Sequence, residues 1–392
     1  MKRTLECGWV TVSAAARPKE RFMSTALAER EAMRIGIVAP PWLPVPPPAY
    51  GGTESVVDRL ARGLVDAGHD VRLWTTADST CPVPRGSVFD VARTELMGTG
   101  IVELQHDIAG YDWLADQGCD VVHDHTLIGP FVRTAGMPVL TTNHGPFDAP
   151  GTTTIFRRLA GEIPIIAISR HQASIASRLG IRVAHVIHHG IDVATIPPGD
   201  GSGDGQGPYL LFLGRINPTK GIIEAIDVAR AAGMRLLIAA KMSEPLEVAY
   251  YDEFVAPRCG DGIDYLGEVC GAEKYRLLGG ARALLNPIQW PEPFGLVMIE
   301  ALATGTPVIA TRHGACPEIV QDGSNGFVCD DHASLVRAVR AAHRLDRREC
   351  RADVARRFNV ETMVARHIGA YRQLLATSTG AATGPKTAMR RT

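Results

Sequence analysis

A repeating order of short apolar runs and helical segments constrains the fold of this chain more than any other feature. The first run, RIGIVA at residues 34–39, precedes a segment over 53–67 in which Val56, Leu60 and Leu64 recur at helical spacing. A second apolar run, DVRLWTT, follows directly. Strands that alternate with helices are typical of a parallel sheet with helices on both faces, because parallel neighbours need a crossover connection. The pattern therefore predicts an α/β fold.

The alternation occurs twice, on either side of a break at residues 196–208. The break reads IPPGDGSGDGQGP, which offers few side chains for a core, so we predict a linker there. Further strands are expected before it at DVVHDH, PVLTTNH, PIIAIS and RVAHVIHHG, and after it at YLLFLGR, RLLIAAK, IDYLGE, ALLNP and PVIATR, with a helix over 218–232. Because 392 residues suit two domains of ordinary size, we predict two Rossmann-like domains, 33–195 and 209–357, that face each other across a cleft.

The two ends of the chain depart from this pattern. Residues 1–32 open with MKRTLECGWVTVSAAA, where Glu6 and Gly8 interrupt a short apolar run, so we interpret them as a disordered leader or an over-extended start. A helix is predicted over 360–375, within a C-terminal segment 358–376. Residues 377–392 are predicted to be a disordered tail.

Composition excludes several classes of protein. The formal net charge is -1, so the chain lacks the basic excess that neutralises a nucleic-acid backbone. Its eight cysteines are scattered without a C-x-x-C pair, which is typical of a reduced cytoplasmic protein and not of a disulfide framework or a zinc site. No apolar run approaches the ~20 residues of a membrane-spanning helix. We expect a cytoplasmic protein that binds no nucleic acid.

The segment WPEPFGLVMIEALATGTPV carries Glu292 and Glu300, eight residues apart, after the predicted strand ALLNP. Ligands of open α/β sheets bind beyond the carboxyl ends of the strands. A helix that starts near Gly295 would offer free N–H groups and its positive dipole end to a diphosphate, with Glu300 ~7 Å further along its axis. Two carboxylates that bracket a diphosphate fit a sugar at one end and a ribose at the other. The alternative is a solvated loop carboxylate and a capping one.

Two further segments suit phosphate groups. Arg215 and Lys220 follow the strand YLLFLGR, where two cations could neutralise a leaving diphosphate, and Lys241 is a further cation of this kind after the next strand. Gly51 and Gly52 end a proline-rich loop before a predicted helix, and a double glycine lets backbone approach a phosphate closely. Ordinary strand-to-helix turns are the alternative at both places.

Histidines cluster at predicted strand ends. His123 and His125 would share one face of a strand, but without a third ligand at a recognisable spacing we expect no metal site. His144 ends the next strand, beside Gly145, and is the candidate for a hydrogen bond to the transferred sugar. The pair His188 and His189 follows later. An inert structural histidine is the alternative for His144.

Together these segments resemble family 4 of the retaining glycosyltransferases, over about residues 33–375. The resemblance implies the two-domain GT-B fold, with segment 358–376 crossing back onto the first domain. It implies transfer of a hexosyl group from a UDP- or GDP-linked sugar to an acceptor hydroxyl, with retention of configuration and without an obligatory metal or other cofactor. UDP-glucose is the favoured donor, and the acceptor, which could be a small molecule, a lipid or a glycan, is left open.

The same resemblance assigns roles to residues of this chain. It places Glu292 on the donor sugar, Glu300 on the nucleotide ribose, Arg215 and Lys220 on the diphosphate, and His144 on the transferred sugar. The donor site would be completed by Gly51, Gly52, Phe294, Gly295 and Leu296.

Two other functions stay open from the sequence. A nucleotide-sugar epimerase could use similar paired domains, and a non-catalytic partner subunit could keep the binding residues without turnover. The basic run Phe156 to Arg158 raises a third question, since it could hold the protein at the inner face of an acidic membrane. A solvated helix face is the favoured interpretation of that run.

Overall fold

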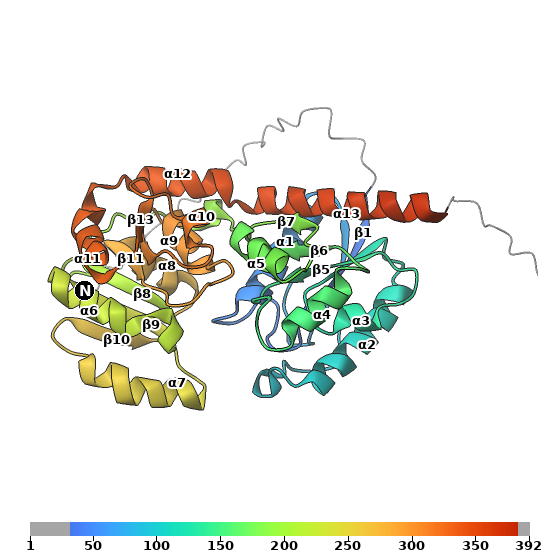
Figure 1. Cartoon of the computed structure of the whole chain (residues 1–392), viewed down its shortest axis with the longest axis horizontal. Coiled ribbons are helices and arrows are strands. Elements are labelled where there is room, and N and C mark those ends of the chain that lie inside the picture. Colours follow the sequence, from blue (N-terminus) through green and yellow to red (C-terminus); the bar gives the residue numbers. More distant parts are fainter. Residues whose placement is uncertain (1–31, 383–392) are drawn as a thin grey trace, which may run out of the picture. The chain divides into compact units, whose positions relative to one another are not determined.

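Two all-parallel β-sheets organise the computed structural model, which describes residues 32–382 (Figure 1). The first sheet has seven strands in the order β3-β2-β1-β4-β5-β6-β7, and the second has six in the order β10-β9-β8-β11-β12-β13. In both sheets the order reverses beside the first strand, as in doubly wound folds, and ligands bind at that reversal. The predicted pair of Rossmann-like sheets is therefore confirmed. The predictions for residues 1–31 and 383–392 lie outside the described residues.

The strands of the first sheet are short. They are β1 (Arg34–Val38), β2 (Asp70–Trp74), β3 (Arg85–Gly86), β4 (Val121–Asp124), β5 (Val139–Asn143), β6 (Ile165–Ala167) and β7 (His185–Val186). The helices among them are α1 (Gly52–Asp66), α2 (Gly100–Asp116), α3 (Gly129–Val132), α4 (Thr152–Leu159) and α5 (Arg170–Arg178), with 3₁₀ turns at Thr94–Leu96 and Val193–Thr195. Only two residues of the predicted strand RVAHVIHHG form β7, which lies at the edge of the sheet and has a single neighbour.

The second sheet repeats this arrangement. Its strands are β8 (Tyr209–Arg215), β9 (Arg235–Lys241), β10 (Ile263–Gly267), β11 (Ala283–Asn286), β12 (Val308–Thr311) and β13 (Gly326–Cys329). Its helices are α6 (Ile222–Ala232), α7 (Pro245–Tyr250), α8 (Gly271–Gly280), α9 (Leu296–Ala303), α10 (Cys316–Ile319), α11 (His332–Ala341) and α12 (Arg347–Arg357). Shorter helical turns span Pro218–Lys220, Tyr251–Val255, Ala256–Arg258 and Ala342–Arg344.

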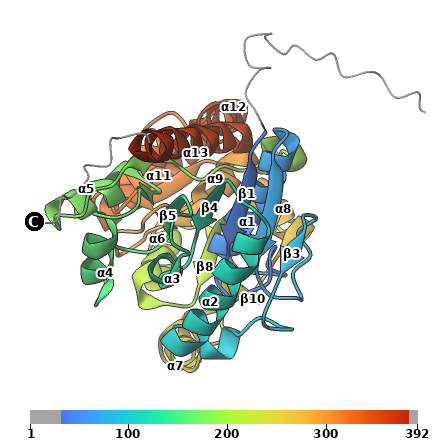
Figure 2. The same cartoon turned by 90° about the vertical axis from the view of Figure 1, so that its right-hand side faces the viewer.

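Alternation along the strands builds a core on each face of a sheet. On β8, Tyr209 and Leu211 join one buried cluster, and Leu210 and Phe212 join the other. Successive side chains of a strand point to opposite faces, so helices must cover both sides, as Figure 2 shows for the first sheet. This two-sided burial is the physical reason for the continuous apolar runs in the sequence.

The predicted helix over 218–232 is split in two. A 3₁₀ turn at Pro218–Lys220 precedes α6, and Gly221 between them has a φ of 75°. A Cβ atom at Gly221 would lie 1.9 Å from the carbonyl oxygen of Pro287. The close approach of the two loops therefore both requires glycine and interrupts the helix.

The last helix, α13 (Val360–Ala382), packs against α1 of the first sheet (Figure 1). Met363, Val364 and Tyr371 join the buried cluster of that sheet, and a Cβ atom at Gly63 of α1 would meet Val364 at 2.5 Å. The helix continues seven residues past the predicted end at 375, so residues 377–382 are helical and not part of a disordered tail. No proline lies between Val360 and Pro385, and alanine favours helix, so the run ATSTGAA continues the helix.

Two segments connect the halves, and they run side by side. Ile191 forms a parallel bridge with Asn359, and its N–H donates to the carbonyl of Phe358 at 2.9 Å. The glycine-rich stretch 196–208 is anchored by the Arg347 guanidinium, which donates to the carbonyl of Gly199 at 3.0 Å. The connection is thus held by specific hydrogen bonds, although its sequence is rich in glycine.

Candidate functional site

The loop between β11 and α9 carries Glu292 to the start of a helix. Gly295, the N-cap of α9, has a φ of 96°, which a side chain would strain. A Cβ atom there would lie 3.9 Å from the carboxyl carbon of Glu292. The carboxylate therefore lies beside the helix start, as the sequence predicted, while Phe294 is buried and Leu296 opens the helix.

Glu292 is paired with Lys220. The Nζ atom of Lys220 lies 2.8 Å from Oε1 of Glu292, and both side chains are more than four-fifths buried. The two loops are fastened together because the N–H of Gln289 donates to the carbonyl of Thr219 at 2.8 Å. The same ammonium lies 5.5 Å from the centre of the Trp290 ring, a cation–π distance. The structure thus brings together two residues predicted from separate motifs.

Arg215 ends β8 and is compensated by carboxylates that the sequence analysis missed. Its Nε donates to Oε1 of Glu247 at 2.8 Å, and its Nη2 also contacts Glu244. Burial would raise the pKa of Glu247, but backbone N–H donors and Arg215 outweigh it and lower that pKa below its usual value. Lys241 lies 3.7 Å from Glu244. The sequence signal for these partners of Arg215 was the pair Glu244 and Glu247, three residues apart just after the end of β9.

Glu300 is buried on α9 and lies between two cations. Lys274 of α8 donates to its Oε1 at 2.9 Å, and Nη2 of Arg59 lies 3.4 Å from the same oxygen. Arg59 comes from α1, two helical turns after Gly52 and on the same face. Nη1 of Arg59 is buried and has no hydrogen-bond partner among the described residues. Sequence reasoning found Glu300 but neither cation.

Gly51 and Gly52 bring the start of a second helix, α1, next to the start of α9. A Cβ atom on Gly52 would lie 3.6 Å from Cδ1 of Leu296, so α1 and α9 begin next to each other. At Gly51 a Cβ atom would lie 2.6 Å from Pro47, so this glycine is required by lack of space and not by a left-handed backbone. Two adjacent helix N-termini concentrate free N–H groups and positive dipole ends.

The histidines form a contiguous cluster. The ring centres of His123 and His125 are 4.0 Å apart, and His125 Nδ1 lies 2.8 Å from His144 Nε2. His144 stacks on His189 at 5.2 Å between ring centres, and His189 contacts Phe294 edge-on at 5.0 Å. His144 therefore lies near the loop that carries Glu292, because the ring of His189 contacts both His144 and Phe294. Within residues 32–378, no group of acidic, cysteine or histidine side chains has an arrangement that could hold a metal ion.

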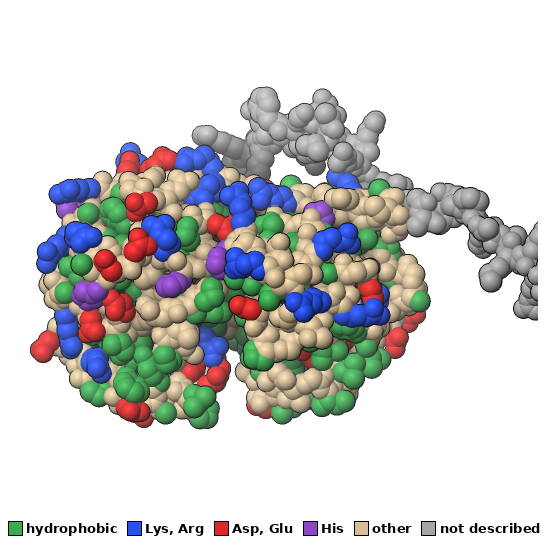
Figure 3. All heavy atoms as spheres, in the orientation of Figure 1, with side chains coloured by type: hydrophobic (Ala, Val, Ile, Leu, Met, Phe, Trp, Pro, Cys, Tyr) green, Lys and Arg blue, Asp and Glu red, His purple; other side chains and the backbone are tan. Residues whose placement is uncertain are grey.

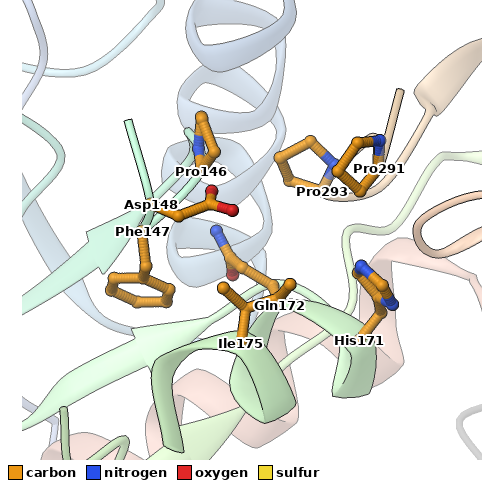
Figure 4. A pocket seen from close by; sticks show the side chains of 8 residues that line it. All are labelled: Pro146, Phe147, Asp148, His171, Gln172, Ile175, Pro291 and Pro293. Carbon is orange, nitrogen blue, oxygen red and sulfur yellow. The ribbon is translucent and has the colours of Figure 1, made fainter. Parts of the chain in front are cut away.

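A small hollow adjoins Glu292. It is lined by Pro146, Phe147, Asp148, His171, Gln172, Ile175, Pro291 and Pro293 (Figure 4). The two prolines that flank Glu292 face the turn that follows His144, and most of the lining is apolar. The hollow therefore joins the neighbourhoods of the two predicted sugar contacts.

This arrangement of two parallel sheets and two converging helix starts defines the GT-B class of glycosyltransferases. A model described as Glycosyltransferase Family 4 matches residues 50–195, and one described as Glycosyl transferases group 1 matches residues 207–344. The chain belongs to family 4 of the glycosyltransferases, as its motifs predicted.

Similar proteins agree with this class. A phosphatidyl-myo-inositol mannosyltransferase of Mycolicibacterium smegmatis is 29% identical over 75% of this chain and 80% of its own length. A D-inositol 3-phosphate glycosyltransferase of Pseudarthrobacter chlorophenolicus is 26% identical over 72% and 79%. Among solved structures, a glycosyltransferase involved in avilamycin A biosynthesis is 28% identical with a TM-score of 0.66, covering 88% of this chain and 98% of its own. A sucrose-phosphate synthase from Thermosynechococcus elongatus shares the fold, with 21% identity, a TM-score of 0.72, and 88% and 100% of the two chains covered.

Proposed function

We propose that this glycosyltransferase moves a hexosyl group from a nucleotide-diphosphate sugar to an acceptor hydroxyl with retention of configuration. The observation that carries the proposal is the Lys220–Glu292 pair beside the adjacent starts of α1 and α9. A diphosphate needs N–H donors and cations, and both are concentrated here. The donor site is formed by residues of both sheets.

The proposal gives each group a role in the chemistry. Lys220 and Arg215 stabilise the negative charge that develops on the leaving diphosphate. Glu292 accepts hydrogen bonds from hydroxyls of the transferred sugar, and Glu300 accepts them from the ribose. His144 donates a hydrogen bond to the same sugar. The bond from the anomeric carbon to the diphosphate oxygen breaks while the bond to the acceptor oxygen forms, and the leaving phosphate takes the proton of the acceptor hydroxyl. No protein base is then needed, and we propose that the reaction also uses no protein nucleophile, obligatory metal or other cofactor.

The identity of the sugar is the finer part of the proposal. The sequence favoured UDP-glucose as the donor, whereas several similar proteins are named phosphatidyl-myo-inositol mannosyltransferases. We therefore propose a mannosyl donor, with UDP-glucose as the alternative. A thermal-shift screen of GDP-mannose, UDP-glucose, GDP and UDP separates the two, because a bound nucleotide raises the unfolding temperature by mass action.

Transfer must then be measured with the donor that binds. An acceptor panel of inositol phosphates, phosphatidylinositol and simple glycosides tests the hydroxyl class that the relatives' names suggest. NMR of the product's anomeric proton reports retention. Binding without transfer to any acceptor would favour a non-catalytic partner subunit, and conversion of the donor without acceptor would favour an epimerase.

We propose a weak peripheral membrane contact separately from the reaction. None of the helices within residues 32–382 is long and apolar enough to span a membrane. Arg158 of the basic run pairs with Glu162 at 2.7 Å, which favours a solvated face. Exposed apolar side chains gather over α7 and the turn after it, including Leu246 and Phe254 (Figure 3). Flotation with anionic liposomes tests the contact, and a protein that stays in the bottom fraction would exclude it.

A further inference from the structure

His144 has one ring nitrogen already engaged. Its Nε2 lies 2.8 Å from Nδ1 of His125, whose side chain is 94% buried behind it. No hydrogen bond to Nδ1 of His144 occurs among the described residues, and this atom is the one left to meet a substrate. The state of His144 is therefore set by its neighbour.

The environment of both rings favours their neutral form. Burial lowers the pKa of His144 to about 3 and that of His125 well below its usual value, with further lowering from neighbouring histidines. A hydrogen bond between two neutral imidazoles needs one N–H and one lone pair. Only two arrangements remain, and they give His144 opposite tautomers.

The second nitrogen of His125 distinguishes these arrangements. Its Nε2 is buried and has no hydrogen-bond partner among the described residues. If the His125 proton were on Nε2, a buried N–H would be orphaned, which is rarer in proteins than an unfilled acceptor. With the proton on Nδ1, His125 donates to Nε2 of His144, and the proton of His144 must be on its own Nδ1.

The ring of His125 is itself held in place. It lies against His123, which bonds to the Tyr371 hydroxyl at 2.8 Å through Nδ1 and to Thr142 Oγ1 at 2.7 Å through Nε2. Tyr371 belongs to α13, so the last helix supports this stack from behind. On the other side His144 stacks on His189, with ring planes 18° apart.

We propose that His125 is a positioning residue that donates from Nδ1 to Nε2 of His144 and thereby presents the Nδ1–H of His144 as a hydrogen-bond donor to the transferred sugar. The role of the sugar contact rests on the proposed function. The tautomer and its cause do not, because they follow from contacts within the first half of the chain and α13.

The test compares two variants at His125. His125→Asn keeps an N–H near the position of Nδ1, whereas His125→Phe keeps the ring volume and removes the donor. Nitrogen-15 histidine NMR at pH 7, with the His144 signals identified by their loss in His144→Gln, should show the Nδ1–H tautomer in the wild type and in His125→Asn. In His125→Phe the Nε2–H form should appear.

Transfer kinetics provide the second readout. We expect kcat to fall more than tenfold in His125→Phe with less than a threefold change in the donor KM, and His125→Asn to recover most of the loss. His343→Phe, at an exposed histidine, is the matched control. An Nε2–H tautomer in the wild type would overturn the inference, as would wild-type tautomer and kcat in His125→Phe.

The two proposals can fail separately. Full activity of His144→Gln would remove the sugar contact from the proposed function, while the NMR result would still decide the tautomer. If His125→Phe does not fold, the spectra of the wild type and of His125→Asn decide the inference alone. A drop in unfolding temperature that is equal in both His125 variants, with equal loss of kcat, would indicate a structural role only and contradict the proposal.

Discussion

Lys220 Nζ and Glu292 Oε1 lie 2.8 Å apart, so two groups predicted to bind different parts of one donor neutralise each other in the structure. A diphosphate would compete with Glu292 for the ammonium and release the carboxylate toward the sugar. Because the pair is largely buried, removal of one partner leaves the other uncompensated. The pair therefore links the phosphate end of the site to the sugar end.

Lys220→Ala should lower donor turnover more than tenfold, because the leaving diphosphate loses a cation. Lys220→Arg, which keeps the charge, should retain more activity. Steady-state kinetics with varied donor checks this, and Arg276→Ala, at an exposed cation paired with Glu273, is the control. Wild-type kcat in Lys220→Ala would contradict the assignment.

Glu300→Ala should also lower turnover more than tenfold, mainly through a higher KM for the donor. Its carboxylate is held by Lys274 and Arg59, so the loss leaves two buried cations without their partner. Arg59→Ala should raise the donor KM less, because Lys274 remains. Calorimetric titration with the nucleoside diphosphate measures both effects, and equal affinity in all three proteins would remove Glu300 from the site.

Glu318 makes a contact that predicts how stability depends on pH. Its carboxylate accepts from the N–H groups of Arg170 and His171 at the start of α5, at 2.9 and 2.7 Å, and contacts His188 Nε2 at 2.8 Å. Burial alone would raise the pKa of Glu318, but these donors outweigh it and lower that pKa. A lowered pKa adds stability above the unfolded value, near 4, that is lost as pH falls through the folded value.

Glu318→Gln should therefore lower the free energy of unfolding by about 1–3 kcal/mol at pH 7, and the difference from wild type should shrink toward pH 3. Denaturant unfolding at both pH values measures it. Glu349→Gln, an exposed carboxylate on α12, is the control. A difference that stays constant with pH would contradict this account.

The buried carboxyls of Asp107 and Asp124 should make stability change with pH in the opposite direction. Both side chains are fully buried, and burial raises both pKa values, that of Asp107 further because Asp124 lies near it. The native state then binds more protons than the unfolded chain above pH 4, so the pair makes stability fall as pH rises. Asp107→Asn should flatten this fall and raise the unfolding temperature relative to wild type at pH 8–9. A variant that is less stable than wild type at both pH 5 and pH 9, with an unchanged slope, would argue against a protonated pair.

Local patterns in the sequence were sufficient for much of the fold. The strands over 209–215 and 235–241 were predicted with the bounds that the structure has, because buried parallel strands leave continuous apolar runs. The helix after Gly295 was equally clear from its glycine and apolar run. The split at Gly221 was not, because it depends on the carbonyl of Pro287, 66 residues further along the chain.

The sequence by itself determined the fold class, the family and the residues that end the strands, because these follow from periodicity and from motifs that are local in the chain. Only the tertiary structure decided which of those residues meet. It paired Lys220 with Glu292, gave Glu300 two cations from separate helices, compensated Arg215 with carboxylates, and joined His125 to His144. The physical reason is that such contacts are between side chains at the ends of different strands and helices, so no spacing along the chain records them.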